Sequence, residues 1–272
     1  MNMKLPYYEW DAECYQQHAK TPEQATLAEL EHYSIENHWH ILDLGCGDGR
    51  ITATLAEKAS QGKIVGIDRS ANMIAYARLY HRDISQLDFQ VMEMKELNSH
   101  DQFDFVLSSW AFHHLPKLEK KEVLKRIFIA LTPGGNLLIT VPKHSVFNHL
   151  IDQFIKTSTW NSYFDKFQDE RSFLAAQEYK DILVKLGYVN IIIEEKIAKS
   201  VFKNTNELML SIQSWLPQFR YLRQVIGIPI QKQHEFLDAI ANLRLKMNPI
   251  DQTNNFIVVE TPYLSIRARK NN

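Results

Sequence analysis

Residues 40–50 combine acidic side chains with three glycines in a spacing that suits the binding of a small ligand. Gly45, Gly47 and Gly49 occupy alternate positions directly after an apolar run. Glycines let the backbone turn through left-handed angles, and a ligand can lie against the bare main chain. Because a helical pattern follows, we expect the amides of the turn and of the helix N-terminus to face that ligand.

The acids of this loop distinguish it from a dinucleotide site. Asp43 and Asp48 lie where they would repel a pyrophosphate, and the G-x-G-x-G spacing lacks the longer second gap of the dinucleotide pattern. A ligand with a cationic end is the better interpretation. Asp68 ends the next apolar run, roughly 20 residues on, where a carboxylate can accept both ribose hydroxyls of a nucleoside. The alternative role for Asp68 is a favourable charge at a helix N-terminus.

The elements that must position these residues alternate between strands and helices. We predict strands at 40–44, 63–67, 88–92, 103–108 and 136–141. Helices are predicted at 21–33 with Thr21 as its cap, at 49–60, after Ser70, and at 118–131, where four lysines (117, 120, 121 and 125) form a solvated face. Such alternation predicts an α/β fold, a doubly wound parallel sheet with right-handed crossovers.

Four candidate residues follow the ends of the first four predicted strands, and they are Gly45, Asp68, Glu93 and Ser108. Ligands bind doubly wound sheets at the carboxyl ends of the strands. We therefore expect these residues on one rim.

The second half of the chain predicts strands at 188–197 and 255–266, the latter interrupted by Pro262. Helices are expected at 178–186 and over 205–247, with a break around Gly227–Pro229. Residues 145–172 are rich in aromatic side chains, which form either core or the lining of an apolar ligand pocket. We expect an N-terminal helical lid over 1–38, a ligand-binding core over 39–142, and the remainder of the sheet over 143–272. The last part would carry a helical cap at about 143–172 and 203–250.

Composition excludes several classes of protein. The 272 residues are 45% apolar and 23% charged with a net charge of −1, which gives no reason to expect nucleic acid or a membrane surface as partner. Cys14 and Cys46 show no paired spacing, so we expect neither disulfides nor a cysteine-based zinc site. No apolar run approaches about 18 residues. A cytoplasmic protein is expected.

Segments 42–49, 66–73, 103–108 and 131–135 resemble the ordered motifs of class I S-adenosylmethionine-dependent methyltransferases. The resemblance spans residues 40–141. It implies a Rossmann-like, seven-stranded, mostly parallel sheet with an antiparallel edge strand, and S-adenosylmethionine as cofactor, with S-adenosylhomocysteine as product. It also implies cofactor contacts: Gly45, Cys46 and Gly47 along the methionine portion, Asp43 near its amino group, Asp68 at the ribose, Arg69 and Met73 beside the adenosine, Glu93 and Met94 at the adenine, and Ser108 and Ser109 near the methionine end.

The remaining similarity is to methyltransferases of small carboxylic acids, namely the trans-aconitate and juvenile hormone acid enzymes. This resemblance is carried by residues 10–15 and 108–115 and by the order of the predicted elements in the C-terminal half. It implies O-methylation of a carboxylic acid. A carboxylate is ionised near neutral pH and needs no general base. Trp110, His113 and His114 are the candidate catalytic residues, either as hydrogen-bond donors to a carboxylate or, for the histidines, as bases toward an amine or phenol.

Alternatives remain open at this point. The same fold serves N- and C-methyltransferases, enzymes acting on an acyl-carrier protein, and non-catalytic regulators that bind the cofactor. We expect a small-molecule acceptor. We expect no metal, because adjacent histidines point in different directions and no acid lies at ligand spacing. Trp10 and Tyr15 are expected in a lid over 7–30.

Overall fold

The computed structural model describes residues 9–248 and 256–272, which form two compact units. The sheet unit comprises Lys20–Lys143, Glu170–Ala198 and Thr261–Asn272. The helical unit comprises Met1–Ala19, His144–Asp169 and Lys199–Glu260. Each unit is described by itself.

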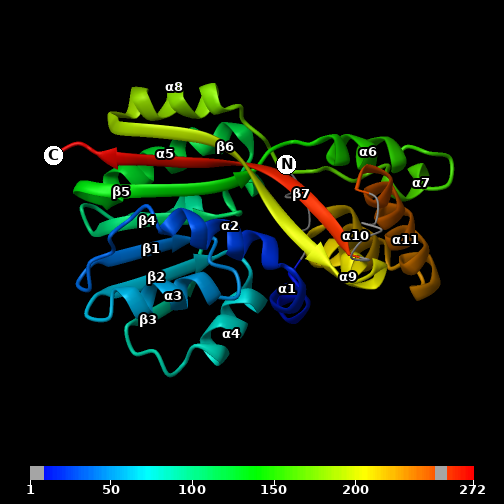
Figure 1. The fold of residues 1–272 in the computed structure, drawn as a ribbon, viewed down its shortest axis with the longest axis horizontal. Coiled ribbons are helices and arrows are strands. Elements are labelled where there is room, and N and C mark those ends of the chain that lie inside the picture. The colour runs from blue at the N-terminus through cyan, green and yellow to red at the C-terminus, as the bar shows by residue number, and fades with distance from the viewer. Residues whose placement is uncertain (1–8, 249–255) are drawn as a thin grey trace, which may run out of the picture. The chain divides into compact units, whose positions relative to one another are not determined.

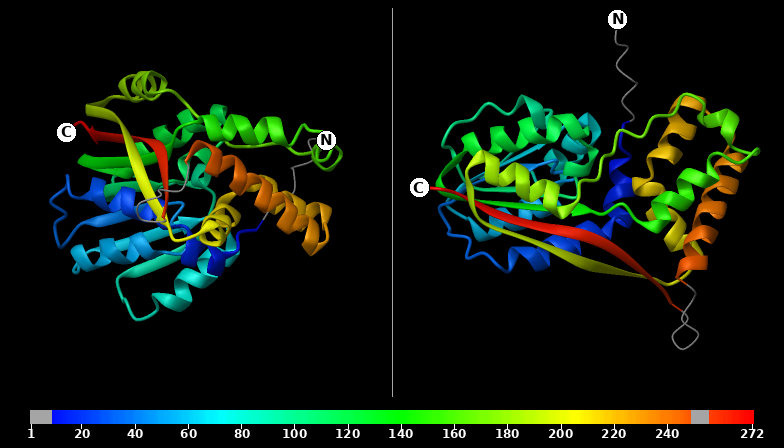
Figure 2. Two further views of the ribbon diagram at one scale, coloured as in Figure 1. Left: turned by 45° about the vertical axis from the view of Figure 1, so that its right-hand side comes forward. Right: turned by 90° about the horizontal axis from the view of Figure 1, so that it is seen from above.

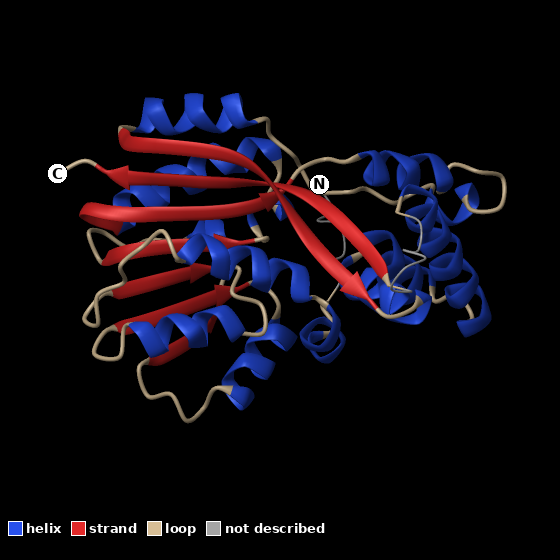
Figure 3. Ribbon diagram, viewed as in Figure 1, coloured by secondary structure: helices blue, strands red, loops and turns tan. Residues whose placement is uncertain are grey.

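The sheet contains seven strands in the order β3-β2-β1-β4-β5-β7-β6 (Figure 1). Their bounds are β1 (His40–Leu44), β2 (Lys63–Asp68), β3 (Leu87–Val91), β4 (Phe103–Ser109), β5 (Leu131–Pro142), β6 (Tyr188–Phe202) and β7 (Ile257–Lys270). Strands β1 to β5 pair in parallel, whereas β7 runs antiparallel to β5 and lies between β5 and the edge strand β6. The predicted mixed, doubly wound sheet is confirmed (Figure 3).

Apolar side chains alternate between the two faces of the sheet and form a separate cluster on each face. Helices cover both faces (Figure 2). Ile41 and Phe105 pack with α2 (Lys20–Leu30) and α3 (Arg50–Lys58). Their neighbours Leu42 and Val106 pack with α5 (Lys117–Ala130) and α8 (Ala176–Leu186). Strands buried on both faces are nearly all apolar, which is why the sequence predicted them well.

Three local predictions were wrong. Helix α2 begins at Lys20, so Thr21 lies inside the helix and is not its cap. Strand β7 runs through Pro262 without interruption, because the proline carbonyl accepts a hydrogen bond from the Lys143 amide at 2.9 Å. A proline lacks only the donor, and its acceptor still serves the ladder. Lys120, expected on a solvated face, is completely buried.

The helical unit contains α1 (Ala12–His18), α6 (Val146–Phe154), α7 (Asn161–Phe164), α9 (Thr205–Trp215), α10 (Pro217–Tyr221), η3 (Leu222–Ile226) and α11 (Ile230–Met247). The predicted break around Gly227–Pro229 is confirmed, since η3 ends before it and α11 begins after it. Trp160 and Phe164 contact Phe236 with ring centroids 5.0 and 5.8 Å apart. These aromatic residues of the 145–172 segment therefore form core.

The first described residues, 9–19, belong to the helical unit. Asp11 pairs with Arg223 at 3.2 Å, and the Arg220 guanidinium lies 3.6 Å from the Trp10 ring centroid. Helix α1 therefore packs within the helical unit, whereas α2 belongs to the sheet unit. Over the described residues, none of the helices has the length and apolar character needed to cross a membrane.

Candidate active site

The carboxyl ends of four adjacent strands carry the predicted site residues. Leu44, the last residue of β1, pairs with Ile67, and Asp68 at the end of β2 pairs with Val91 at the end of β3. Asp43 of β1 pairs with Leu107 of β4. Gly45, Asp68, Glu93 and Ser108 thus follow or end neighbouring strands, and the predicted rim is confirmed.

Hydrogen bonds to strand β2 hold the start of the glycine loop. Gly45, Gly47 and Gly49 have φ values of 75°, 56° and 80°, which L side chains rarely adopt. The amides of Gly45 and Cys46 both donate to the carbonyl of Ile67, at 2.7 and 3.0 Å. The expectation that the loop amides face a ligand was wrong at these positions, because the neighbouring strand β2 supplies the acceptor.

Two of the glycines are required by close packing. A Cβ on Gly45 would lie 2.3 Å from the Cβ of Ala111 and 2.8 Å from the Cε of Met94. A Cβ on Gly49 would lie 2.7 Å from the Phe89 ring. Gly49 therefore seats helix α3 against β3, whereas Gly45 lets the segment after β4 approach the glycine loop.

Asp43 is a buried carboxyl group with one oxygen free. Its Oδ2 accepts a hydrogen bond from the Thr52 hydroxyl at 2.8 Å, while Oδ1 has no hydrogen-bond partner in the described structure. Burial raises the pKa of Asp43 to about 7, against the opposing hydrogen bond from Thr52, and the carboxylates of Asp68 and Asp48 raise it further. A cationic group at Oδ1 would satisfy this oxygen and stabilise its charge.

Asp48 plays a different part from the one that the sequence indicated. Its carboxylate pairs with the Arg50 guanidinium, which also reaches Glu23 on α2 at 3.0 Å. The Asp48 charge is therefore compensated inside the protein, so it gives no reason to expect a cationic ligand. Only Asp43 retains that argument.

Asp68 accepts hydrogen bonds from the amides of Gly47, at 3.0 Å, and Ser70, at 2.8 Å. Ser70 in turn caps α4 (Ala71–Tyr80) by accepting from the Met73 amide at 3.1 Å. Asp68 thus connects the glycine loop to the start of the next helix.

The other predicted cofactor residues lie along the same rim. Arg69 forms an ion pair with Glu170 at 3.7 Å, and Met73 is buried. Glu93 precedes the short helix η1 (Met94–Glu96), and its amide donates to the Glu96 side chain at 3.3 Å. Cys46 is also buried, and it packs in a cluster with Ile74, Ala77 and Phe89. Any ligand contact at Cys46 would therefore involve its backbone.

Ser108 and Ser109 end strand β4 with different partners. The Ser108 hydroxyl donates to the Leu44 carbonyl at 2.9 Å and so links β4 to the end of β1. The Ser109 hydroxyl lies 2.7 Å from that of Thr26 on α2.

Trp110 is held in a strained conformation directly after β4. Its φ is 48°, which is unfavourable for a bulky side chain and costs of order 1–3 kcal/mol. Its amide donates to the Thr140 carbonyl at 2.8 Å, and its ring lies 6.0 Å from that of Tyr263. The indole Nε1 is buried and has no hydrogen-bond partner in the described structure. Such an outlier beside a strand end supports a functional role.

His113 and His114 lie on the short helix η2 (Phe112–His114), with ring centroids 4.1 Å apart. The ring of Phe173 stacks on His113 at 5.8 Å, and the His113 carbonyl accepts from the Ser172 amide at 2.9 Å. The structure therefore brings both histidines and Trp110 onto the one segment that follows β4.

Helix α2 carries functional contacts that the sequence analysis missed. Glu23, Thr26 and Glu29 recur every third residue and share one face. Glu23 reaches Arg50, Thr26 reaches Ser109, and Glu29 is buried. A polar residue at each third position of an N-terminal helix was the signal that could have revealed this face.

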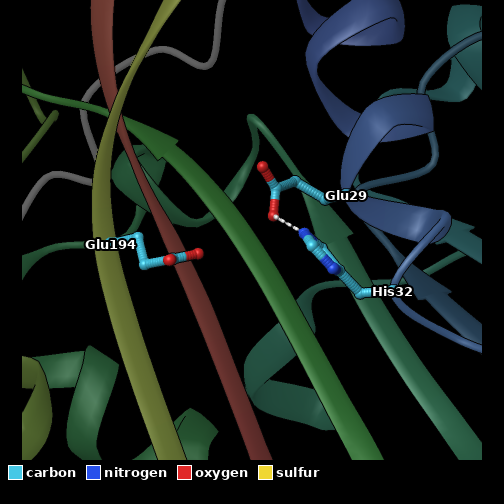
Figure 4. A group of neighbouring side chains, drawn as sticks. All are labelled: Glu29, His32 and Glu194. Carbon is cyan, nitrogen blue, oxygen red and sulfur yellow. Dashed lines mark ion pairs between the residues drawn. The ribbon is translucent and has the colours of Figure 1, made fainter.

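Glu29, His32 and Glu194 form the group whose ligand atoms lie within 4.8 Å of one another (Figure 4). The Glu29 oxygens already accept from Lys196 at 2.7 Å, Tyr263 at 3.0 Å and Ser265 at 2.5 Å. A metal would have to displace these donors. The group therefore fixes α2 to β6 and β7, and we assign it no metal.

Comparison with known proteins agrees with the geometry. Residues 41–135 match the methyltransferase domain family. Juvenile hormone acid O-methyltransferase of Bombyx mori is 23% identical over 262 residues, which cover 90% of each chain. Trans-aconitate 2-methyltransferase of Deinococcus radiodurans is 28% identical over 207 residues, 74% of this chain and 78% of that one.

The fold also matches solved structures. Phosphoethanolamine N-methyltransferase 2 of Haemonchus contortus, solved with phosphomonomethylethanolamine and S-adenosylhomocysteine, superposes with a TM-score of 0.59 at 18% identity. The match covers 92% of this chain and 53% of that one, so this chain spans about half its length. At that identity the similarity concerns the fold. The domain match over residues 41–135 and the curated relatives support a class I S-adenosylmethionine-dependent methyltransferase, similar to the trans-aconitate and juvenile hormone acid branch.

Proposed function

We propose that the protein transfers a methyl group from S-adenosylmethionine to a carboxylate oxygen of a small organic acid. The observation that carries the proposal is the buried indole N–H of Trp110, which has no hydrogen-bond partner among the described residues and is held at the end of β4 by a strained backbone. A fixed hydrogen-bond donor suits a methyl acceptor that is already ionised, such as a carboxylate. Relatives whose names specify an acid acceptor, juvenile hormone acid and trans-aconitate, support the same choice.

The residues at the rim fit the cofactor by their chemistry. Oδ1 of Asp43 would accept from the cationic amino group of the methionine portion, which explains why a buried oxygen lacks a protein partner. Asp68 would hold the ribose hydroxyls. Gly45 and Gly47 would present bare backbone along the methionine portion.

The remaining assignments follow the rim outward. We place the adenosine beside Arg69, Met73, Glu93 and Met94, the backbone of Cys46 along the methionine portion, and Ser108 and Ser109 near its methionine end. When bound, S-adenosylmethionine supplies a methyl group on a cationic sulfur, which is already a strong electrophile. The protein then has to orient the acceptor and exclude water.

Trp110, His113 and His114 would orient the acceptor. The Trp110 N–H would donate to one carboxylate oxygen, leaving the other as the nucleophile. The histidines would act as further donors. A carboxylate has a pKa near 4 and requires no proton removal at neutral pH, so no base is needed.

Calorimetry with S-adenosylhomocysteine tests the cofactor assignments. Asp68→Ala should weaken binding at least tenfold, since a hydrogen bond to a charged group is worth about 1.5–3 kcal/mol. Asp104→Ala is the matched control, because Asp104 accepts from the His40 amide at the opposite end of the strands. Equal affinity for wild type and Asp68→Ala would remove Asp68 from the cofactor site.

A cofactor-consumption screen over small acids, fatty acids, amines and phenols tests the acceptor class. For an acid substrate, Trp110→Phe should raise the acceptor KM about tenfold, because it removes the N–H but keeps a ring. At saturating cofactor, His113→Gln should leave the pH profile between pH 6 and 8 with the same shape as that of wild type. Turnover confined to amines, with a histidine-dependent pH profile, would instead indicate an N-methyltransferase. Tight cofactor binding without turnover of any compound would indicate a regulator.

A further inference from the structure

Lys120 is a lysine at a core position. It has no exposed surface, and it lies on α5 in register with Val123, Leu124 and Ile127, which are all fully buried. Spacings of three, four and seven residues define the face of a helix that packs against the sheet. The neighbouring Lys121 is exposed. Buried lysines are rare unless they are paired, because an ammonium group loses its hydration.

The buried ammonium contacts one short segment. The Lys120 Nζ donates to the carbonyl oxygen of Phe112 at 2.5 Å and lies 5.2 Å from the centroid of the Phe112 ring. Phe112 opens η2, and His113 and His114 follow it directly. A hydrogen bond from a charged donor is stronger than one between neutral groups. It fixes the first peptide of the turn that carries both histidines.

Among the residues that the structure describes, no acid pairs with the Lys120 ammonium. Burial alone lowers the pKa of Lys120 to about 7, without a contribution from any neighbouring charge. The elements that contact α5 carry these titratable or charged side chains: Lys95 and Glu96 on η1, His113 and His114 on η2, Glu178, Tyr179, Lys180, Asp181 and Lys185 on α8, and Tyr188 on β6, whose hydroxyl donates to the Leu124 carbonyl. Glu178 is already paired with Lys117 at 2.7 Å. The Phe112 carbonyl is thus the polar group that the ammonium engages.

A leucine or methionine at position 120 would fill the same core without the cost of desolvating an ammonium group. A buried ammonium group that costs desolvation energy needs an explanation, and a functional role supplies one. We propose that Lys120 is a positioning residue, whose bond to the Phe112 carbonyl holds the His113–His114 turn in the geometry that orients the methyl acceptor. This inference rests on the proposed function for the histidines' role, but the contact itself can be tested without any substrate.

The chain offers a single spectroscopic label for this contact. Phe112–His113 is the one Phe-His pair in the whole sequence. Protein carrying carbonyl-¹³C phenylalanine and ¹⁵N histidine therefore gives a single carbonyl–amide correlation, which reports the oxygen that Lys120 contacts. Wild type, Lys120→Met and the control Lys121→Met would be compared between pH 5.5 and 9.

We expect the carbonyl shift of wild type and Lys121→Met to move through an inflection near pH 7 that Lys120→Met lacks. Any contribution from titrating imidazoles is retained in Lys120→Met, so the difference belongs to the lysine. Identical curves for the three proteins would overturn the proposal. If Lys120→Met does not fold, a flat wild-type curve would overturn it equally.

The effect on activity is measured with the acid substrate that the cofactor-consumption screen finds. Lys120→Met should lower kcat/KM for the acceptor at least tenfold, with most of the loss in kcat, and keep the S-adenosylhomocysteine Kd within twofold. Lys121→Met should change neither. A merely structural lysine would instead alter unfolding and cofactor affinity together, and that result would contradict the proposal. Failure of wild type to bind S-adenosylhomocysteine would refute the proposed function while leaving the carbonyl titration valid.

Discussion

The Thr26 hydroxyl on α2 and the Ser109 hydroxyl at the end of β4 lie 2.7 Å apart, although 83 positions separate them in the chain. The same Thr26 oxygen is 3.0 Å from the Thr140 hydroxyl on β5. Since Trp110 directly follows Ser109 and donates its amide to Thr140, this hydroxyl group joins α2 to the strained turn. Helix α2 is thereby part of the rim on which the candidate residues lie.

Replacing Thr26 by valine should destabilise the protein by about 1–3 kcal/mol, because the isosteric methyl leaves the buried Thr140 hydroxyl and the half-buried Ser109 hydroxyl without their partner. The free energy of unfolding in urea measures this change. Trp110 fluorescence should shift as its turn loosens.

Thr26→Ser is the matched control, since it keeps the hydroxyl and loses only a methyl group. It should retain the wild-type emission of Trp110 and most of the stability. If valine and serine destabilise equally, the methyl group matters and the hydroxyl network does not.

Asp43 should make cofactor affinity pH-dependent. Its pKa is about 7 in the folded protein, against 3.8 ordinarily, so between these values the folded state binds more protons than the unfolded state. Stability should therefore fall as pH rises from about 4 to 7. A cationic ligand favours the ionised carboxylate, so affinity for S-adenosylhomocysteine should increase up to about pH 7 and then level off.

Calorimetry from pH 5.5 to 8.5 checks this dependence. Asp43→Asn should show weaker binding with a flat profile, because the amide does not titrate. A profile for Asp43→Asn that still rises toward pH 7 would assign the dependence to another group.

Gly45→Ala should abolish cofactor binding, whereas Gly227→Ala should not. Both glycines have positive φ, 75° and 68°, and each alanine pays about 1–2 kcal/mol for it. Only Gly45 is also crowded, since its Cβ would lie 2.3 Å from that of Ala111, and nothing lies within 4 Å of the Gly227 Cβ. Unfolding and calorimetry of both variants separate the two effects. Equal losses would show that steric crowding at Gly45 is unimportant.

The strands and their rim could be predicted because apolar runs and glycines act locally. The pairing of Asp48 with Arg50 could not, since a carboxylate in a loop looks the same whether a ligand or an arginine meets it. The direction of the Gly45 amide could not be predicted either, because its hydrogen-bond acceptor, the Ile67 carbonyl, lies on another strand.

Lys120 was predictable in principle. Its spacing from Leu124 and Ile127 marks the buried face of α5, but its charge outweighed that pattern in the sequence analysis. A charged residue in register with apolar neighbours is thus worth treating as buried until a structure excludes it.

Gln218→Met should stabilise the protein. Gln218 on α10 is fully buried, and neither its Oε1 nor its Nε2 has a hydrogen-bond partner in the described structure. An unsatisfied buried amide costs about 1–3 kcal/mol, and methionine fills a similar volume without polar atoms. We expect a gain of that size in the free energy of unfolding.

Gln233→Met is the control, because the Gln233 amide donates to the Ile228 carbonyl at 2.9 Å, and its loss should destabilise by about 1 kcal/mol. Destabilisation by both substitutions would mean that the Gln218 amide has a partner, such as an ordered water, that offsets its burial.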